Sequence, residues 1–467
     1  MTDPVYADVQ GTILRGYRVD LARHFVLAVV DAAAARRLIG ALVAGSGGLP
    51  RITTAARWEP GQKPECFLNV GFTAVGLRQL GVTDQQLRTF DRAFRRGATD
   101  EQTARDMGDV GDSAPRNWIG GLDDGSQVHV LLSLWVDDDA ALLEQITARL
   151  RAAFAGCLRE LSTHDAKALP DNQVHFGYRD SIAQPRVQGA PPRKPQYDVP
   201  DGQAEVPTGE FLLGYPHAGG GTYKVEPMQL SKNSSYAAFR ILEQDVAGFE
   251  AFLVEYAAQA KIDVELLAAK VCGRWRNGNP LTLVPDPAPV LPNQRLNDFQ
   301  YVSDDAAKDD TLGVRCPIGS HIRRNNPRNE QVTGAESVFH RIVRRAMPYG
   351  PPYDPARPDG ARRGLVGYFI NASLYNQFEF ITSQWNLGHQ FVVSVPAPPG
   401  CPGNVTASIS GEDVFLGVND AKNSSFTLAA CGSRTTLKGF SRFVTTRGGA
   451  YVFLPSITGL RYLSGLT

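Results

Sequence analysis

The sequence predicts an α+β protein built from two halves of similar plan. In each half, short apolar stretches with the length of buried strands alternate with stretches whose apolar residues recur at helical spacing. An irregular, proline-rich stretch at 164–234 separates the two halves. Connections of such length inside a compact protein usually carry functional loops. The 467 residues of the chain are enough for two such halves with a large core.

The first half contains three predicted strands, each followed by a predicted helix. Strands are expected where β-branched and aromatic residues cluster, at 22–30, 66–72 and 128–136. Each helix should begin after an Asp or Thr residue that can cap it, which places helices at 32–43, 73–80 and 137–154. This alternation is compatible with a split β-α-β unit and an antiparallel sheet.

The second half repeats the alternation, as a duplicated unit would. Its predicted strands are at 235–242, 365–371 and 451–454. Its predicted helices are at 244–260, 263–273 and 375–385. We therefore expect an N-terminal unit at 1–163, connecting loops at 164–234 and a C-terminal unit at 235–467.

Composition excludes several classes of partner and site. Lys plus Arg and Asp plus Glu are both 48, so the net charge is +0 and gives no field that would attract nucleic acid or a membrane surface. No apolar segment has the length of a bilayer span. The six cysteines are scattered without a Cys-x-x-Cys pair, which argues against zinc, iron–sulfur and c-type haem sites and favours reduced core thiols. The N-terminus shows neither a signal peptide nor a twin-arginine leader, so we expect a cytoplasmic protein.

The most unusual stretch is basic and runs from Cys316 to Gly350. It sets His321 and His340 among six arginines, with Glu330 and Glu336 as its only acids. A neutral imidazole nitrogen can ligate a metal, and arginines can bind carboxylates or a developing oxyanion. A solvated basic loop would have the same composition, so this stretch alone leaves both interpretations open.

A second charged motif, His175-Phe-Gly-Tyr-Arg-Asp180-Ser181, lies in the irregular stretch. Asp180 could be a turn residue that pairs with the neighbouring Arg179. It could instead be a carboxylate held over an active site as a proton relay. The motif by itself does not decide between these interpretations.

Taken together, several motifs resemble those of the dye-decolorizing peroxidases, a family of haem peroxidases, and they occur in the family's order. The resemblance spans nearly the whole chain and is closest to the larger bacterial and fungal branch. The motifs are Val9-Gln-Gly-Thr-Ile-Leu14, Asn69-Val-Gly-Phe-Thr-Ala-Val-Gly-Leu77, Met107-Gly-Asp-Val-Gly-Asp-Ser-Ala-Pro-Arg-Asn-Trp118, His175 to Asp180, Gly209-Glu-Phe-Leu-Leu-Gly-Tyr-Pro216, Lys270-Val-Cys-Gly-Arg-Trp275, His321 to Arg328, and Arg341 to Gly350.

The resemblance implies two ferredoxin-like units with antiparallel sheets and peripheral helices, and haem b held in the C-terminal half. His321 matches the proximal histidine that binds the haem iron. Asp180 matches the distal acid and Arg344 the distal arginine. Asp413 resembles the acid that is bonded to the proximal histidine, although the adjacent Glu412 could take its place.

The implied activity is the reduction of hydrogen peroxide and the oxidation of small-molecule electron donors, such as dyes and phenolics, through compound I. A carboxylate can move the peroxide proton, and a guanidinium can stabilise the charge on the leaving oxygen. Arg323 and Arg328 are candidates for binding the haem propionates, with a surface role as the alternative. Tyr349 and Trp385 are candidate surface relays to bulky donors, with core packing as the alternative.

Two other functions remain open. Manganese(II) could be the donor, with Glu210 and acids of the 298–310 stretch as its ligands. A haem carrier or sensor with little turnover could use the same fold. The presence of both Asp180 and Arg344 favours the peroxidase, because a carrier needs neither. The chain departs from the family's Gly-x-x-Asp-Gly motif at Ser181, which puts peroxide reactivity, but not haem binding, in doubt. It also departs from a frequent Tyr-Gln pair at Ile370-Asn371, which puts the distal packing in doubt.

Overall fold

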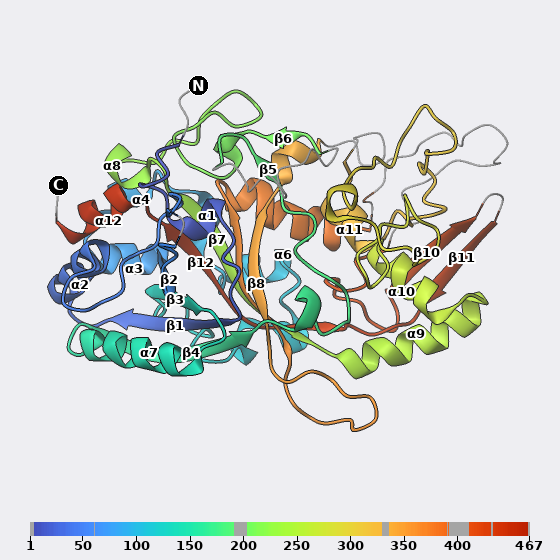
Figure 1. The fold of residues 1–467 in the computed structure, drawn as a ribbon, viewed down its shortest axis with the longest axis horizontal. Coiled ribbons are helices and arrows are strands. Elements are labelled where there is room, and N and C mark those ends of the chain that lie inside the picture. The colour runs from blue at the N-terminus through green and yellow to red at the C-terminus, as the bar shows by residue number, and fades with distance from the viewer. Residues whose placement is uncertain are drawn as a thin grey trace.

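One antiparallel sheet runs through both halves of the protein (Figure 1). The structure is a computed structural model that describes residues 4–59, 61–190, 203–328, 336–389, 391, 411–430 and 433–465. Within these ranges eight strands join in the order β4-β1-β3-β2-β12-β7-β9-β8. Their bounds are β1 Leu21–Val29, β2 Cys66–Phe72, β3 Val130–Val136, β4 Leu158–Lys167, β7 Ser235–Gln244, β8 Val343–Tyr349, β9 Gly364–Asn371 and β12 Val444–Leu454.

Each half contributes four strands in the same spatial order. The N-terminal strands lie in the order β4-β1-β3-β2, and the C-terminal strands in the matching order β12-β7-β9-β8. This order, with helices between the first and second and the third and fourth strands of each half, is that of a ferredoxin-like unit. The prediction of two ferredoxin-like α+β units is therefore confirmed. The two sheets are continuous, because Phe72 of β2 pairs with Phe453 of β12.

The sheet curls so that its two halves face each other. The edge strands β4 and β8 approach one another. In addition, the hydroxyls of Ser133 on β3 and Tyr368 on β9 lie 2.7 Å apart, although these strands are not neighbours in the sheet. Every residue of β3 is buried. This burial on both faces explains why β3 is apolar throughout apart from Ser133.

The predicted helices form where their capping residues indicated. Asp31 accepts a hydrogen bond from Ala34 at the start of α2 (Ala32–Ala44), and Asp139 does the same for α7 (Ala140–Phe154). Asp245 and Asp263 cap α9 (Val246–Ala260) and α10 (Val264–Cys272). The region predicted to be helical at 375–385 forms two π-helical segments, η8 (Leu374–Glu379) and η9 (Ile381–Asn386). The shorter α-helices are α1 Gly11–Leu14, α3 Ala74–Gln79, α4 Asp84–Leu87, α5 Arg92–Arg96, α6 Glu101–Asp106, α8 Met228–Ser231, α11 His321–Asn325 and α12 Ile457–Ser464.

Two of the sheet strands, β4 and β8, have no counterpart in the sequence prediction. Both lie at an edge of the sheet and contain polar residues, and β8 includes Arg344, Arg345 and Pro348. Edge strands carry weak apolar patterns because one side faces solvent or loops. A separate hairpin of β10 (Ser425–Ala430) and β11 (Ser433–Lys438) was also not predicted. Strand β4 crosses the expected unit boundary at 163, and the division of the chain at 163 and 234 stays a prediction.

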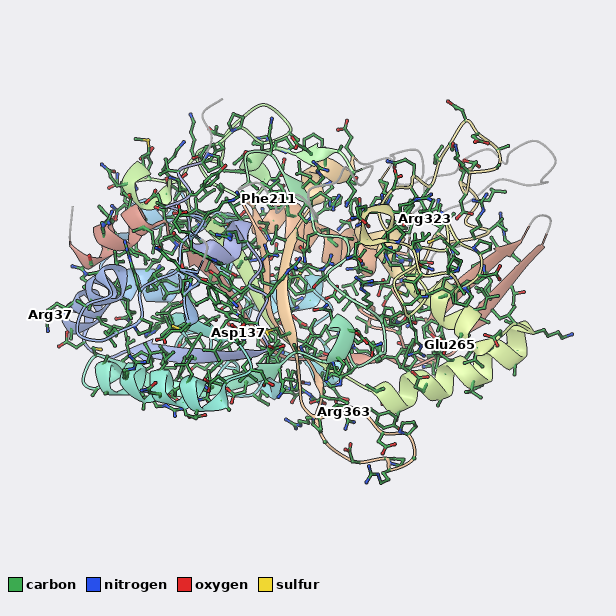
Figure 2. All side chains as sticks on the ribbon, viewed as in Figure 1. Arg37, Asp137, Phe211, Glu265, Arg323 and Arg363 are labelled. Carbon is green, nitrogen blue, oxygen red and sulfur yellow. The ribbon has the colours of Figure 1, made fainter. Side chains whose placement is uncertain are left out.

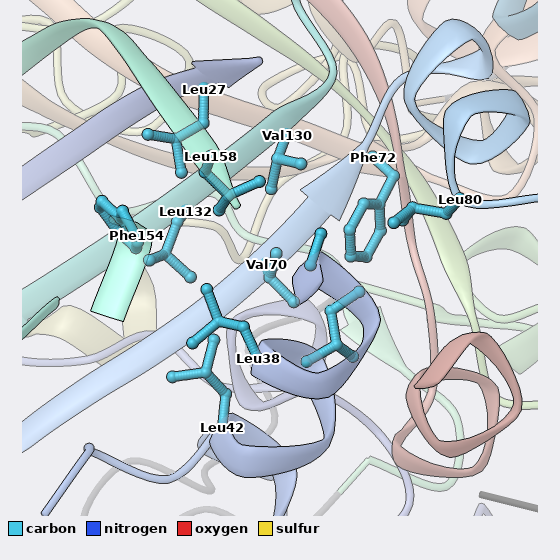
Figure 3. Close-up of a pocket in the computed structure, with 12 residues that line it drawn as sticks. Leu27, Leu38, Leu42, Val70, Phe72, Leu80, Val130, Leu132, Phe154 and Leu158 are labelled. Carbon is cyan, nitrogen blue, oxygen red and sulfur yellow. The ribbon is translucent and has the colours of Figure 1, made fainter. Parts of the chain in front are cut away.

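An apolar cavity lies in the core of the N-terminal unit (Figure 3). Leu38 and Leu42 of α2 face Val70 and Phe72 of β2 across it, and Phe154 of α7 closes one side. All side chains that line it are aliphatic or aromatic. It therefore offers no group for acid–base chemistry or metal binding, and the charged motifs must act elsewhere.

The charged motifs lie in long insertions around the C-terminal unit. Asp180 comes from the connection between β4 and β7, α11 from the connection between α10 and β8, and Asp413 from the connection between η9 and β12. Among the described cysteines, Cys66, Cys157, Cys272 and Cys316 are free thiols, and Cys401 and Cys431 lie outside the described residues. No helix in the described ranges combines the length and apolarity that a membrane span requires.

Candidate active site

His321 is the first residue of the short helix α11, and its ring is held from one side by a carboxylate. The Nδ1 atom lies 3.0 Å from Oδ2 of Asp413. The His321 side chain is 30% exposed, whereas that of Asp413 is fully buried. Within the described residues, Nε2 of His321 has no hydrogen-bond partner. An imidazole that donates its Nδ1 proton to a carboxylate has an unprotonated Nε2, which is free to bind a metal.

Asp413 is held in place by the main chain that follows it. Its Oδ1 atom accepts hydrogen bonds from the amides of Phe415 at 2.9 Å and Leu416 at 2.8 Å. Burial by itself raises the pKa of Asp413, but the contact with His321 and the hydrogen bonds outweigh it, so the pKa lies below its usual value. The carboxylate therefore stays charged and can support a basic imidazole.

Glu412, the alternative partner for His321, is engaged elsewhere. Its Oε2 atom accepts hydrogen bonds from the main-chain amides of Val418 and Asn419. Its Oε1 atom lies 3.4 Å from Nε2 of His389. Of the two adjacent acids, only Asp413 contacts His321 in the described structure.

Arg324 and Asn325 also support this region, although no role was predicted for either from the sequence. The fully buried Arg324 donates hydrogen bonds to the carbonyls of Gly319, Trp385 and Gly411, and so ties α11 to the segment before Asp413. Asn325 Nδ2 donates to the carbonyl of His321 at 2.8 Å and lies 3.3 Å from its Nδ1. Buried hydrogen-bonded arginines of this kind cannot be told from ligand-binding ones by sequence.

Asp180 and Arg344 come together as the resemblance implied. Arg344 Nη2 lies 3.4 Å from Asp180 Oδ1, and the two side chains are 31% and 43% exposed. Gln184 docks the Asp180 loop onto strand β8. Its Oε1 accepts from the Arg344 amide and its Nε2 donates to the Arg344 carbonyl, both at 3.1 Å. This pair of hydrogen bonds, which was not predicted from the sequence, couples the position of the acid to that of the arginine.

Ser181 has a left-handed backbone at the position where the family carries glycine. Its φ is +64°. Gly177 in the same loop has a φ of +81°. A residue with a Cβ atom adopts this conformation only at a cost, whereas glycine adopts it freely. The departure from the motif that the resemblance implies therefore adds strain directly after Asp180.

Arg323 does not have the environment expected of a propionate ligand. Its side chain is fully buried, in the C-terminal half of the molecule (Figure 2). Its Nη atoms donate hydrogen bonds to the carbonyls of Asp310, Thr311 and Cys316. Because no part of Arg323 reaches open space, the expected propionate contact is not supported, and Arg323 serves to hold the loop before α11.

Arg328 keeps a partly exposed side chain. It donates to the carbonyls of Asn297 at 3.0 Å and Phe299 at 2.8 Å, and its guanidinium lies 3.7 Å from the centroid of the Phe299 ring. These contacts fix its position without burying it completely. Its role as a propionate ligand stays a prediction.

The two expected surface relays differ in exposure. Trp385 is only 3% exposed and packs against Ile318, Ile381 and Phe391, so its assignment as a surface residue is wrong and the packing interpretation holds. Tyr349 is partly exposed, but its hydroxyl is buried and has no hydrogen-bond partner among the described residues. Burial raises the pKa of Tyr349. A relay role for Tyr349 stays a prediction.

The acids expected to bind manganese(II) are not gathered. In the part of the chain that the structure describes, no three His, Cys, Asp or Glu side chains are placed to hold a metal ion. Glu210 is buried and accepts a hydrogen bond from the amide of Ala218, and burial raises its pKa to about 7. Asp310 accepts from the amides of Arg315 and Cys316.

Comparisons with known proteins agree on one family. The DyP dimeric alpha+beta barrel domain matches residues 8–170. A curated relative named Peroxidase 2, from Mycetinis scorodonius, is 30% identical over 97% of this chain and 86% of its own length. The crystal structure of a fungal DyP-type peroxidase from Auricularia auricula-judae is 26% identical, with a TM-score of 0.80 over 99% of this chain and 100% of that one. A dye-decolorizing peroxidase in complex with 2,6-dimethoxyphenol is 28% identical, with a TM-score of 0.80 over 98% and 99%. The chain therefore belongs to the dye-decolorizing peroxidases, a family of haem-dependent enzymes.

Proposed function

We propose that this peroxidase binds haem b through Nε2 of His321, reduces hydrogen peroxide, and oxidises phenolic and dye donors. The observation that carries the proposal is the 3.0 Å contact between His321 Nδ1 and the buried carboxylate of Asp413. A carboxylate on Nδ1 fixes the tautomer and makes the other nitrogen a stronger ligand. His321 is partly exposed while its support is buried, as a ligand that faces a cofactor requires.

The donor set fits a haem rather than a bare metal ion. His321 brings one imidazole, and no further His, Cys, Asp or Glu among the described residues gathers with it into a metal cage. A single protein ligand is sufficient for haem, because the porphyrin itself supplies the nitrogen ligands that surround the iron. The bound haem would supply the redox chemistry that breaks the peroxide O–O bond.

The roles of the protein groups follow from their chemistry. Asp180 accepts a proton from one oxygen of the peroxide and returns it to the other, directly or through water. Arg344 stabilises the negative charge that develops on the peroxide oxygens. Their 3.4 Å separation and partial exposure allow both groups to contact one small molecule. The complex of a related enzyme with 2,6-dimethoxyphenol supports a phenol as a donor.

A visible spectrum and rapid mixing test this proposal. Purified protein should show a Soret band that is absent in His321→Ala. Asp180→Asn and Arg344→Leu should keep the band but react with peroxide about 10²-fold more slowly, because each removes one of the groups that act on the O–O bond. Asp171→Asn is a matched control, since Asp171 is exposed in the same connection. A wild-type rate in Asp180→Asn would instead favour a haem carrier or sensor.

A further inference from the structure

Phe415 contacts both the proposed haem ligand and the loop that carries the proposed distal acid. The centroid of its ring lies 5.4 Å from that of the His321 ring, and the two planes are inclined at 81°. The same ring lies 5.3 Å from the ring of Phe176 and 5.8 Å from that of Tyr178. Phe176 and Tyr178 belong to the motif that ends at Asp180. One side chain therefore joins the two parts of the site, which come from separate insertions.

The main chain of Phe415 also supports the proposed ligand. Its amide donates a hydrogen bond to Oδ1 of Asp413 at 2.9 Å, and Oδ2 of the same carboxylate lies 3.0 Å from Nδ1 of His321. Aromatic rings favour an edge-to-face contact at this centroid separation, and the contact restricts rotation of the imidazole. The carboxylate on Nδ1 restricts the same rotation. Phe415 therefore acts on the orientation of His321 twice, through its ring and through its amide.

Helix α10 forms a second link between the same two segments. The hydroxyl of Tyr178 donates to the carbonyl of Ala268 at 2.8 Å. The hydroxyl of Ser320, the N-cap residue of α11, donates to the carbonyl of Lys270. Lys270 lies in the last turn of α10, where helix carbonyls lack a partner within the helix, so the serine hydroxyl supplies one. The loop and the start of α11 are thus attached to α10 only two positions apart.

The rings of this group are buried and packed on one another. Phe176, Tyr178 and Phe415 are all buried, and Phe249 of α9 lies 4.7 Å from Phe176 and 5.2 Å from Phe415. Protein interiors are close-packed, so a change in one ring is transmitted to its neighbours. Packing alone explains why aromatic residues meet here. It does not require that one of them also contacts the proposed haem ligand and bonds its carboxylate.

The attachment of the loop to strand β8 is separate from these links. Gln184 and His175 each donate a hydrogen bond to a main-chain carbonyl of that strand. These bonds hold Asp180 beside Arg344. They do not involve α11, so it is the aromatic group and α10 that relate the acid to the imidazole of His321.

We propose that Phe415, assisted by Tyr178, is a positioning residue that sets the placement of His321 relative to Asp180 for the reaction with peroxide. The inference rests on the proposed peroxidase function and deepens it. Asp180 transfers a proton efficiently only within hydrogen-bond reach of the peroxide, and His321 fixes where the haem would sit. A shift of one group relative to the other therefore lowers the rate. Phe415 itself moves no proton, and it acts through the groups that it holds.

Hydrogen exchange of the holoenzyme, followed by mass spectrometry, tests the coupling without reference to turnover. The amides of Gly177, Arg179 and Asp180 donate to main-chain carbonyls that hold the loop. Phe415→Leu should raise their exchange severalfold, because the smaller side chain loosens the loop far away in the sequence. Exchange that matches the wild type would show that the ring does not hold the loop, and would overturn the proposal.

Phe252→Leu is the matched control. Phe252 is buried in the same core cluster as Phe415, and the substitution removes the same atoms. Its ring contacts among the described residues are with Phe249, Tyr256, Phe440 and Phe443. The control should leave the exchange of the loop unchanged. An equal effect in both variants would reveal a general loosening of the core and would also overturn the proposal.

Two measurements on the same holoenzymes complete the test. In Phe415→Leu the iron–histidine stretching frequency should fall, because a less well oriented imidazole shares less of the Asp413 charge, and the rate constant with peroxide should fall about tenfold. Should that variant fail to fold, Tyr178→Phe keeps the ring, removes only the bond to α10, and should slow the reaction severalfold.

The outcomes separate this inference from the proposed function. Phe176→Leu and Phe415→Leu should not be additive in their effect on the rate constant, because both remove one contact. Additive effects, or a normal Soret band with wild-type rate constants in Phe415→Leu and Tyr178→Phe, would defeat this inference alone. A wild-type protein without a Soret band would defeat the proposed function and this inference with it.

Discussion

The Nδ1 atom of His321 lies 3.0 Å from Oδ2 of Asp413, which is 92 positions away in the chain. The two residues come from separate insertions of the C-terminal unit. Asp413 keeps its charge because its contacts offset the effect of burial on its pKa. The proposed ligand and its supporting carboxylate are therefore brought together by tertiary structure, and the pair is open to a direct test.

Replacing Asp413 by Asn should weaken the imidazole as a ligand. The amide oxygen can still accept from Phe415 and Leu416, so the fold should persist, but the negative charge beside Nδ1 is lost. We expect a higher haem reduction potential and a 10- to 100-fold loss, to order of magnitude, in haem affinity or peroxide reactivity. Spectroelectrochemical titration and stopped-flow mixing measure these quantities.

Glu412→Gln is the control for that experiment, because Glu412 bonds the amides of Val418 and Asn419 and does not contact His321. It should leave the haem potential unchanged. If Glu412→Gln raised the potential as much as Asp413→Asn, the assignment of the supporting acid would be wrong.

Gln184→Ala should slow the reaction with peroxide without loss of haem. The variant removes both bonds to the main chain of Arg344, so Asp180 and Arg344 are no longer held in register. A misplaced catalytic pair typically costs at least about tenfold in rate. The second-order rate constant should fall while the Soret band keeps its position. Gln173→Ala, at an exposed residue of the same connection, should react like the wild type.

Ser181→Gly should stabilise the protein. The φ of +64° at Ser181 costs a non-glycine residue about 1–2 kcal/mol, and the greater freedom of glycine in the unfolded chain offsets part of the gain. We expect the free energy of unfolding to rise by about 0.5–1 kcal/mol, measured by urea denaturation with an unchanged slope. Ser126→Gly, at a loop residue whose φ is not positive, should instead lower the free energy of unfolding. A loss of stability in Ser181→Gly would show that the hydroxyl contributes more than the strain.

Glu210 should make the stability of the protein depend on pH. Burial raises its pKa from 4.5 to about 7, so the folded state holds the proton more tightly than the unfolded state. This contribution is fully present below the unfolded pKa and is lost as the pH rises through the folded pKa. Glu210→Gln should therefore match the wild type near pH 5 and exceed its unfolding free energy by roughly 2–3 kcal/mol near pH 8. Urea titrations at the two pH values test this, with the exposed Glu255→Gln as a control that shows no such change.

Much of the fold could be predicted because the central strands are buried on both faces. Strands β1, β2 and β3 are mostly apolar, and the helices α2 and α7, which follow β1 and β3, begin at Asp residues that cap them. The edge strands β4 and β8 could not be predicted, because polar residues on an edge carry no clear period. The residue pattern of β8 did not predict a strand. Arg344, which lies on β8, was instead identified as a site residue from the resemblance of its motif to a known family.

The sequence by itself determined the two-unit α+β plan and the residue types of a haem peroxidase site, since these depend on local periodicity and on motifs. Only the tertiary structure decided which arginine is internal and which acid supports the histidine. Arg323 and Arg328 lie five positions apart in one basic motif, yet the first is fully buried among carbonyls and the second remains partly exposed. Asp413 and Glu412 are adjacent, yet only one points at His321. Burial and hydrogen-bond partners are set by contacts between distant segments, and no single segment of the sequence contains that information.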